Sequence, residues 1–172
     1  MPDSSISLWR QLKAAAALPL VAVVLVPALL MWLAPAPLAS GGRLWILRPL
    51  GALLALAGLA LGAWTVMLFR DMGRGTLAPW DAPRCLVVQG PYRHLRNPMI
   101  SGAMGIILGE ALLFNSLPVL IWFCVFAVVN AVYMPLWEEP GLARRFGEDY
   151  RIYQANVPGW LPRLRPWRPG EE

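Results

Sequence analysis

Residues 100–137 read ISGAMGIILGEALLFNSLPVLIWFCVFAVVNAVYMPLW, and this stretch decides the fold. It carries a single charged side chain, that of Glu110. Asn115 and Ser116, followed by a proline, interrupt the apolar run in a way that is typical of a turn. The pattern therefore predicts two apolar helices, 100–114 and 117–137, joined as a tight hairpin.

Two further apolar stretches precede this hairpin. Residues 14–34 carry no charge, and residues 44–69 are interrupted only by Arg48 and Pro49 near their start. At a rise of ~1.5 Å per residue, each is long enough to cross a hydrocarbon core of ~30 Å. The predicted fold class is an all-α membrane protein, with one domain over 1–172 and a bundle of about four transmembrane helices.

The composition supports a membrane protein over a soluble one. Hydrophobic residues make up 58% of the chain and charged residues 15%, which is too few for the polar shell of a soluble domain. The two cysteines, Cys85 and Cys124, lie far apart, and His94 is the single histidine. Neither a disulfide framework nor a multi-histidine metal site follows, so we expect no metal.

A cleaved signal peptide is the alternative interpretation of the first apolar stretch. Arg10 and Lys13 would form its basic region, and residues 36–40, APLAS, loosely resemble a cleavage site. The apolar run is longer than usual for a signal peptide and further spans follow, which favours a membrane anchor.

The net charge of +5 comes almost entirely from arginine, and the arginines flank the apolar runs. This placement indicates membrane topology and argues against a nucleic-acid partner. With four crossings, the basic loop 70–98 and the basic C-terminal tail lie on one side, which the positive-inside rule assigns to the cytoplasm. We expect both termini there, and the alanine- and arginine-rich bias suggests a bacterial inner membrane.

The C-terminal tail has a helical pattern of its own. Apolar residues recur there at near-helical spacing, at Leu142, Phe146, Tyr150, Tyr153 and Val157. The pattern predicts an amphipathic helix over 141–156, lying against the bundle or the headgroups on the cytosolic face. Prolines then end regular structure, and Trp160 and Trp167 suit a membrane interface.

Two polar clusters are candidates for chemistry. Residues 90–99, GPYRHLRNPM, form a turn rich in hydrogen-bonding groups immediately before an apolar helix. Such a turn either holds a polar cofactor or is a basic cluster that only sets topology. Glu138 and Glu139 lie where the fourth apolar stretch ends. They are either functional carboxylates or the favourable first turn of a helix that starts near Pro140.

Polar and small residues within the apolar stretches are weaker candidates. Glu110 and Asn130 both lie inside the predicted hairpin, where ionisable groups are often functional, although Glu110 can equally lie near the outer interface. The glycines at Gly51, Gly58 and Gly62 and within 102–105 predict close helix packing better than a nucleotide loop.

The ordered set of motifs resembles the isoprenylcysteine carboxyl methyltransferases and the related phospholipid methyltransferases. The resemblance covers roughly residues 58–163. Its motifs are GTLAP at 75–79, LVVQGPYRHLRNPM at 86–99, Glu138-Glu139, FGEDYRIY at 146–153 and VPGWLP at 157–162.

This resemblance implies a bundle of transmembrane helices with S-adenosylmethionine bound at the cytosolic face and S-adenosylhomocysteine released as product. The acceptor would be a lipid, an isoprenoid or a small hydrophobic molecule. The implied catalytic residues are Glu138, Glu139 and Arg144, the last of which can hold an anionic headgroup. The implied cofactor-binding residues are Arg84, Cys85, Leu86, Val87, Tyr92, Arg93, His94, Leu95, Asn97, Pro98, Met99, Ile100, Glu138 and Glu139.

Two positions depart from the pattern of the prenylcysteine enzymes. Asn97 stands where many members have histidine, and Met134, Pro135 and Leu136 occupy the region of an arginine that engages the substrate carboxylate. The second departure argues against a carboxylate substrate of that type. A membrane oxidoreductase related to sterol reductases and using NADPH, and a non-enzymatic membrane subunit, are the alternative functions.

Overall fold

The computed structural model describes residues 20–40, 44–72 and 86–168, without the side chains of residues 69–72. Apart from one isolated bridge, all regular structure in these ranges is helical. The elements are the π-helical turn η1 (Val21–Leu25), α2 (Val26–Leu33), α3 (Leu44–Met72), the 3₁₀ turn η3 (Gly90–Arg93), α4 (Pro98–Leu113), α5 (Leu117–Tyr133), the π-helical turn η4 (Met134–Glu138) and α6 (Glu139–Asn156).

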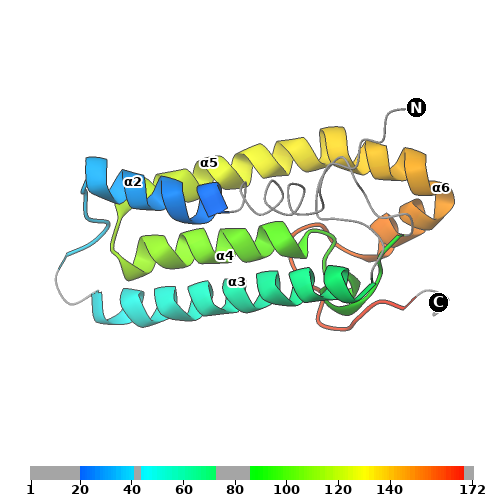
Figure 1. Ribbon diagram of the computed structural model, residues 1–172, viewed down its shortest axis with the longest axis horizontal. Coiled ribbons are helices and arrows are strands. Elements are labelled where there is room, and N and C mark those ends of the chain that lie inside the picture. Colours follow the sequence, from blue (N-terminus) through cyan, green and yellow to red (C-terminus); the bar gives the residue numbers. More distant parts are fainter. Residues whose placement is uncertain (1–19, 41–43, 73–85, 169–172) are drawn as a thin grey trace, which may run out of the picture.

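The helices α2, α3, α4 and α5 lie side by side along the long axis of the molecule (Figure 1). The predicted hairpin is confirmed as α4 and α5, which turn through Phe114, Asn115 and Ser116. The side chain of Ser116 caps α5 by accepting a hydrogen bond from the amide of Val119. Because α3 and α4 are antiparallel, α3 ends where α4 begins, and we call this end of the bundle the site end.

Glycines bring α3 and α4 into backbone contact. A Cβ atom on Gly58 would lie 2.4 Å from the carbonyl oxygen of Gly102, and one on Gly109 would lie 2.5 Å from the amide of Ala55. No side chain fits at such distances, so these positions require glycine. Gly62 differs, because a Cβ atom there would meet nothing within 4 Å. The predicted close packing is therefore confirmed at Gly58. A Cβ atom on Gly62 would point away from the contact between α3 and α4.

The opposite end of the bundle is closed by Asn115. This residue has a positive φ of 56°, which asparagine tolerates better than most residues. Its side chain accepts a hydrogen bond from the amide of Ala39 and donates one to the carbonyl of Ala39, both at 2.8 Å. The segment after α2 is thereby tied to the α4–α5 turn, and Pro37 and Ser116 form an isolated bridge.

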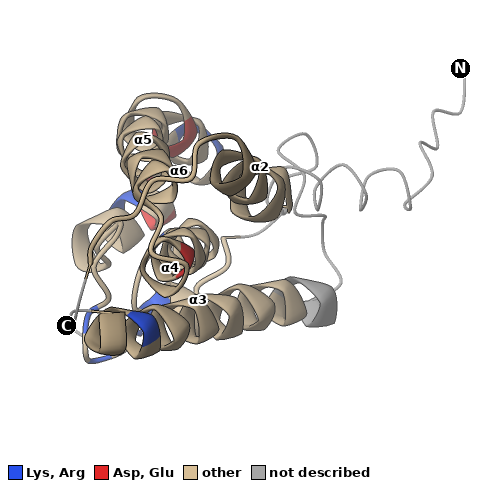
Figure 2. Cartoon of the chain, turned by 90° about the vertical axis from the view of Figure 1, so that its left-hand side faces the viewer, with Lys and Arg blue, Asp and Glu red and all other residues tan. Residues whose placement is uncertain are grey.

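The buried core is small and lies between η1, α4 and α5. It consists of Val23, Ile107, Ala111 and Val119. Large apolar side chains elsewhere face outwards, among them Trp32 at 78% exposure. Charged residues are sparse along the helices (Figure 2). An apolar exterior of this kind fits a chain whose surroundings are lipid.

Two helical runs are long and apolar enough to cross a membrane, namely 44–68 within α3 and 117–156, which joins α5, η4 and α6. The helices over 21–33 and 98–113 are apolar but shorter. The predicted boundaries of the helices agree with the observed ones within a few residues, except that 14–19 and residues 73–85 of the predicted loop 70–98 lie outside the described residues. Whether four helices cross remains a prediction.

Two local features shape the helix that runs from α5 into α6. Pro135 lacks an amide hydrogen, and the chain widens into the π-helical turn η4 around it. Gly147, with φ 60° and ψ −130°, breaks α6 in the middle. Figure 1 shows the second half of α6 turning back toward the bundle after this break. The turn buries Tyr150 and Tyr153 against the site end.

The break at Gly147 gives a direct test of this arrangement. We expect Gly147→Ala to destabilise the protein by about 1–2 kcal/mol, because an L-residue is strained at this φ. Gly141→Ala is the matched control, since neither glycine has an atom within 4 Å of an added Cβ and Gly141 has helical geometry. Alanine at 141 should stabilise by up to about 1 kcal/mol. Thermal unfolding in detergent measures both, and equal shifts in melting temperature would contradict the role of the break.

Candidate functional site

The site is built on the turn that precedes α4. Gly90 has a φ of +53°, and its Cα lies so near the Trp64 indole of α3 that an added Cβ would be 3.3 Å from the ring nitrogen. Pro91 follows as the second residue of η3, where its fixed φ suits the turn. The turn is thereby fixed against α3, and it places Tyr92 at the site end.

The C-terminal segment is hydrogen-bonded along this turn. The amides of Arg163 and Trp167 donate to the carbonyls of His94 and Arg93, each at 3.0 Å, and the amide of Arg96 donates to Pro158 at 2.9 Å. The His94 ring adds a bond of 2.8 Å from Nδ1 to the carbonyl of Arg163, for which Nδ1 carries the proton. The ring of His94 therefore fastens the tail.

The strongest polar interaction of the site joins this turn to α6. The guanidinium of Arg96 lies 2.8 Å from Oε1 of Glu139, and the two side chains are 15% and 12% exposed. The other Glu139 oxygen accepts a hydrogen bond of 2.7 Å from the Gln154 amide. Arg96 also donates to the backbone carbonyl of Gln154 at 2.8 Å. Both oxygens of Glu139 are thus occupied by groups of the protein itself.

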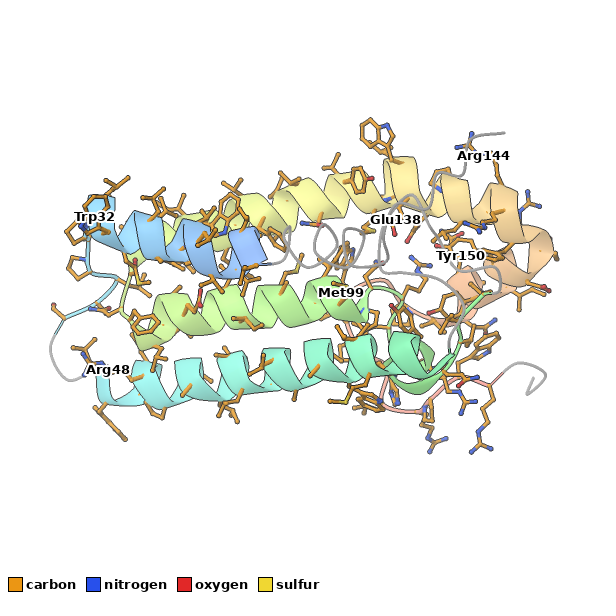
Figure 3. The ribbon with its side chains drawn as sticks, in the orientation of Figure 1. Trp32, Arg48, Met99, Glu138, Arg144 and Tyr150 are labelled. Atoms are coloured by element: carbon orange, nitrogen blue, oxygen red, sulfur yellow. The ribbon has the colours of Figure 1, made fainter. Side chains whose placement is uncertain are left out.

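Glu138 lies one residue earlier and has a different environment. It belongs to η4, and Figure 3 shows it pointing from the α5–α6 junction toward the end of the bundle where Met99 begins α4. Burial and the neighbouring Glu139 charge raise the pKa of its carboxyl. Burial and the charge of Glu138 also raise the pKa of the Tyr92 hydroxyl. The carboxylate of Glu138 and the ring of Tyr92 therefore share one partly desolvated region.

Two buried polar atoms near this region have no hydrogen-bond partner within the described part of the chain. They are Nε of Arg96 and the hydroxyl oxygen of Ser101, which lies in the first turn of α4. Buried donors normally have partners, because an unsatisfied one costs about 1–3 kcal/mol. A polar group of a ligand that reached either atom would satisfy it.

The remaining predicted cofactor-binding residues differ in their burial and in their contacts. Tyr92 is half-buried, Leu95 is 4% exposed, and Leu86 packs against the Tyr150 cluster. Asn97 donates from Nδ2 to the carbonyl of Gly159 at 3.3 Å. Val87, Met99 and Ile100 are half-buried and Pro98 is buried. Arg84 and Cys85 lie outside the described residues.

The arginines near the two glutamates belong to two elements, the turn before α4 and helix α6. Arg93 donates from Nε to the carbonyl of Val88 at 3.3 Å, within its own turn. Arg144 is exposed and projects from the outer side of α6 in Figure 3. Arg145 lies over the ring of Phe146, 5.5 Å from its centroid. The structure therefore does not bring Arg144 together with the two glutamates.

Glu110 and Asn130 are not neighbours. Asn130 lies about 20 Å along α5 from the hairpin turn, whereas Glu110 lies about 5 Å from it along α4. Asn130 uses its Nδ2 to bond the carbonyl of Phe126 in its own helix. The two residues therefore form no common site.

Sequence reasoning did not select three residues that the structure brings into the site, namely Arg96, Ser101 and Gln154. Arg96 lay inside the quoted motif, and its position between a turn and an apolar helix was the available signal. Gln154 contacts Glu139 only because α6 folds back at Gly147, and no local pattern shows that. Within 20–40, 44–72 and 86–168 no group of three metal-ligating side chains is present.

Two helices that are long and apolar enough to cross a membrane meet a polar, carboxylate-containing region at one end of the bundle. A family model described as phospholipid methyltransferase matches residues 47–149. The chain belongs to the phospholipid methyltransferase family, which implies a methyltransferase that acts on membrane lipids. No curated protein and no solved structure matches the chain.

The ion pair between Arg96 and Glu139 can be tested by a double-mutant cycle. We expect Arg96→Met and Glu139→Gln each to destabilise by about 2–4 kcal/mol, since each leaves a buried partner unpaired. The double variant should lose much less than the sum of the two. Free energies of unfolding in mixed micelles measure these effects.

The control for this cycle is the exposed pair of Glu148 and Arg151. Their atoms lie 3.6 Å apart, and the side chains are 71% and 70% exposed. Glu148→Gln should therefore cost less than about 1 kcal/mol. Additive losses at Arg96 and Glu139, or an effect no larger than at Glu148, would contradict the account of the site.

Proposed function

We propose that this protein transfers the methyl group of S-adenosylmethionine to a lipophilic acceptor at the cytosolic face of the membrane. The observation that carries the proposal is that two adjacent glutamates have different surroundings. Each oxygen of Glu139 has one partner, Arg96 or Gln154, whereas Glu138 points toward the start of α4 in the region shared with Tyr92. Family membership supports methyl transfer as the reaction.

The residues of the site suit the polar part of this cofactor. The carboxylate of Glu138 would bind its ammonium group or its ribose hydroxyls, and the unpartnered Arg96 Nε and Ser101 hydroxyl would bind acceptor atoms. Tyr92 and residues 97–100 would wall the pocket, and backbone groups of 84–87 would lie along it. The cofactor supplies a methyl group already activated on a sulfonium, so no nucleophilic side chain is required.

The contribution of the protein is then alignment and proton removal. Holding the acceptor in line with the methyl group converts a bimolecular reaction into one within a complex. For an amine acceptor, a Glu138 carboxylate that contacts the ribose hydroxyls and not the ammonium group would be the available base. A raised pKa makes its carboxylate a better proton acceptor than an ordinary one.

The acceptor would approach from the lipid. Where the prenylcysteine enzymes carry an arginine, this chain has Met134, which is 5% exposed, then Pro135 and then Leu136, which is 60% exposed. An apolar approach to Glu138 fits a lipid better than a substrate with a free carboxylate. The arginine-rich segments on both sides of the site support a cytosolic location by the positive-inside rule.

Binding of S-adenosylhomocysteine to the detergent-purified protein, measured by calorimetry, tests the proposal. We expect Glu138→Gln to lower the affinity at least about tenfold, as loss of a charge-assisted hydrogen bond of about 1.5–3 kcal/mol implies. Arg144→Gln is the comparison, because Arg144 lies away from the region, and it should leave binding unchanged. Binding of NADPH instead would indicate the oxidoreductase alternative, and binding of neither would favour a non-enzymatic subunit.

The affinity for S-adenosylhomocysteine should depend on pH through the ionisation of Glu138. The ionised form of Glu138 binds the ammonium group, so affinity falls as the pH falls through the raised pKa of this carboxyl. The decline should begin at a higher pH than for an ordinary glutamate, and it should disappear in Glu138→Gln. A profile that is the same in both proteins would contradict the assignment.

A further inference from the structure

The C-terminal segment from Val157 to Arg168 has no regular structure but is fixed to the rest of the protein. Its sequence is VPGWLPRLRPWR. Backbone hydrogen bonds hold it to the site turn at Pro158, Arg163 and Trp167, and the side chain of Asn97 holds it at Gly159. The segment therefore presents its remaining side chains in defined positions.

Some apolar side chains of this segment are buried. Val157 is 1% exposed and Trp167 is 9% exposed, and the Trp167 ring lies 5.9 Å from that of Tyr153. The ring of Trp167, a residue expected at the membrane interface, is part of the cluster around the second half of α6.

Two leucines of the same segment are exposed instead of buried. Leu161 is 81% exposed and Leu164 is 98% exposed, the highest value among the large apolar side chains of the described residues. Both lie between the fixed points, so neither leucine can collapse onto the protein without breaking hydrogen bonds. Exposed leucines on a fixed scaffold, in a protein that buries other apolar side chains nearby, indicate a surface that something else covers.

The charge and position of this surface indicate what covers it. Between 157 and 168 the chain has three arginines and no acidic residue, and Arg165 is exposed beside Leu164. Asn97 and Pro98, where the segment is attached, begin the apolar helix α4. The segment thus lies at the level where apolar helices give way to polar structure, which for helices in a bilayer is the headgroup region.

We infer that Leu161, Leu164 and Arg165, which we call the tail surface, dock on anionic phospholipid headgroups of the membrane that holds the protein. The leucines enter the boundary between headgroups and acyl chains, and Arg165 contacts a lipid phosphate. The interaction has a consequence for the site, because the same segment is hydrogen-bonded to His94, Arg96 and Asn97. Docking holds the turn before α4 at the level of the lipid headgroups. An effect of docking on methyl transfer rests on the proposed function.

The docking is tested by the depth of a nitroxide at position 164. The label is placed through Leu164→Cys in full-length protein whose two native cysteines are serine, reconstituted in nanodiscs of phosphatidylcholine with and without phosphatidylglycerol. Collision rates with oxygen and with a water-soluble nickel complex report the depth. With anionic lipid, we expect the label to lie about 5–10 Å below the phosphates, as interfacial apolar side chains do.

Position 148 is the matched control, since Glu148 is 71% exposed and charged, and a label there should stay accessible to the nickel complex. Adding Arg165→Gln should reduce the difference between the two lipid compositions at position 164. A label at 164 that is as accessible to nickel as one at 148 overturns the inference. So does a label shielded from both reagents, which would indicate that a second copy of the chain covers the tail surface.

The link to activity is measured separately. Leu161→Ser/Leu164→Ser should bind S-adenosylhomocysteine like the unchanged protein in detergent, which shows that the site is folded. In nanodiscs, anionic lipid should raise the rate of methyl transfer by the unchanged protein. It should not raise the rate of the double variant. Docking of the label, together with no binding of S-adenosylhomocysteine by the unchanged protein, would refute the proposed function and leave the tail surface as a membrane contact.

Discussion

Arg96 and Glu139 are brought together from two distant parts of the chain, and their ion pair organises the site end of the molecule. The pair is nearly enclosed, so each charge depends on the other and on Gln154 for the hydrogen bonds that water would otherwise supply. Arg96 belongs to the turn that begins α4, and Glu139 begins α6. The pair therefore fixes the relative position of the two segments that supply Tyr92 and Glu138. The adjacent carboxylate, Glu138, is not part of this pair.

The rest of the fold can be understood as the support of this pair. Glycines let α3 approach α4 closely, and Trp64 of α3 packs on Gly90 of the turn. Asn115 closes the far end of the bundle, because its side chain is hydrogen-bonded to the backbone amide and to the carbonyl of Ala39. At the site end, the break at Gly147 returns α6 to the turn, where Tyr153 donates its hydroxyl to the carbonyl of Tyr92 at 2.8 Å. Polar contacts are concentrated at the two ends, as expected when the middle of a bundle faces hydrocarbon.

Much of this arrangement could be predicted from the sequence. Apolar runs between turn residues gave the helices, and the Asn-Ser-x-Pro interruption gave the hairpin, because both depend on local backbone chemistry. The small-residue contacts were also predictable in kind. The pairing of Arg96 with Glu139 was not, because it depends on how two remote segments meet. The same holds for His94 and Trp167, which look like cofactor and interface residues in sequence and instead hold the C-terminal segment in place.

The account depends most on the claim that the site at the start of α4 supports methyl transfer to a membrane lipid. The direct measurement is transfer of labelled methyl groups from S-adenosylmethionine to the lipid fraction of proteoliposomes containing the purified protein. The account predicts label in the lipid extract with the unchanged protein and with Arg144→Gln, and its near-complete loss with Glu138→Gln in protein that still folds. Label in no lipid, or unchanged transfer by Glu138→Gln, would contradict it.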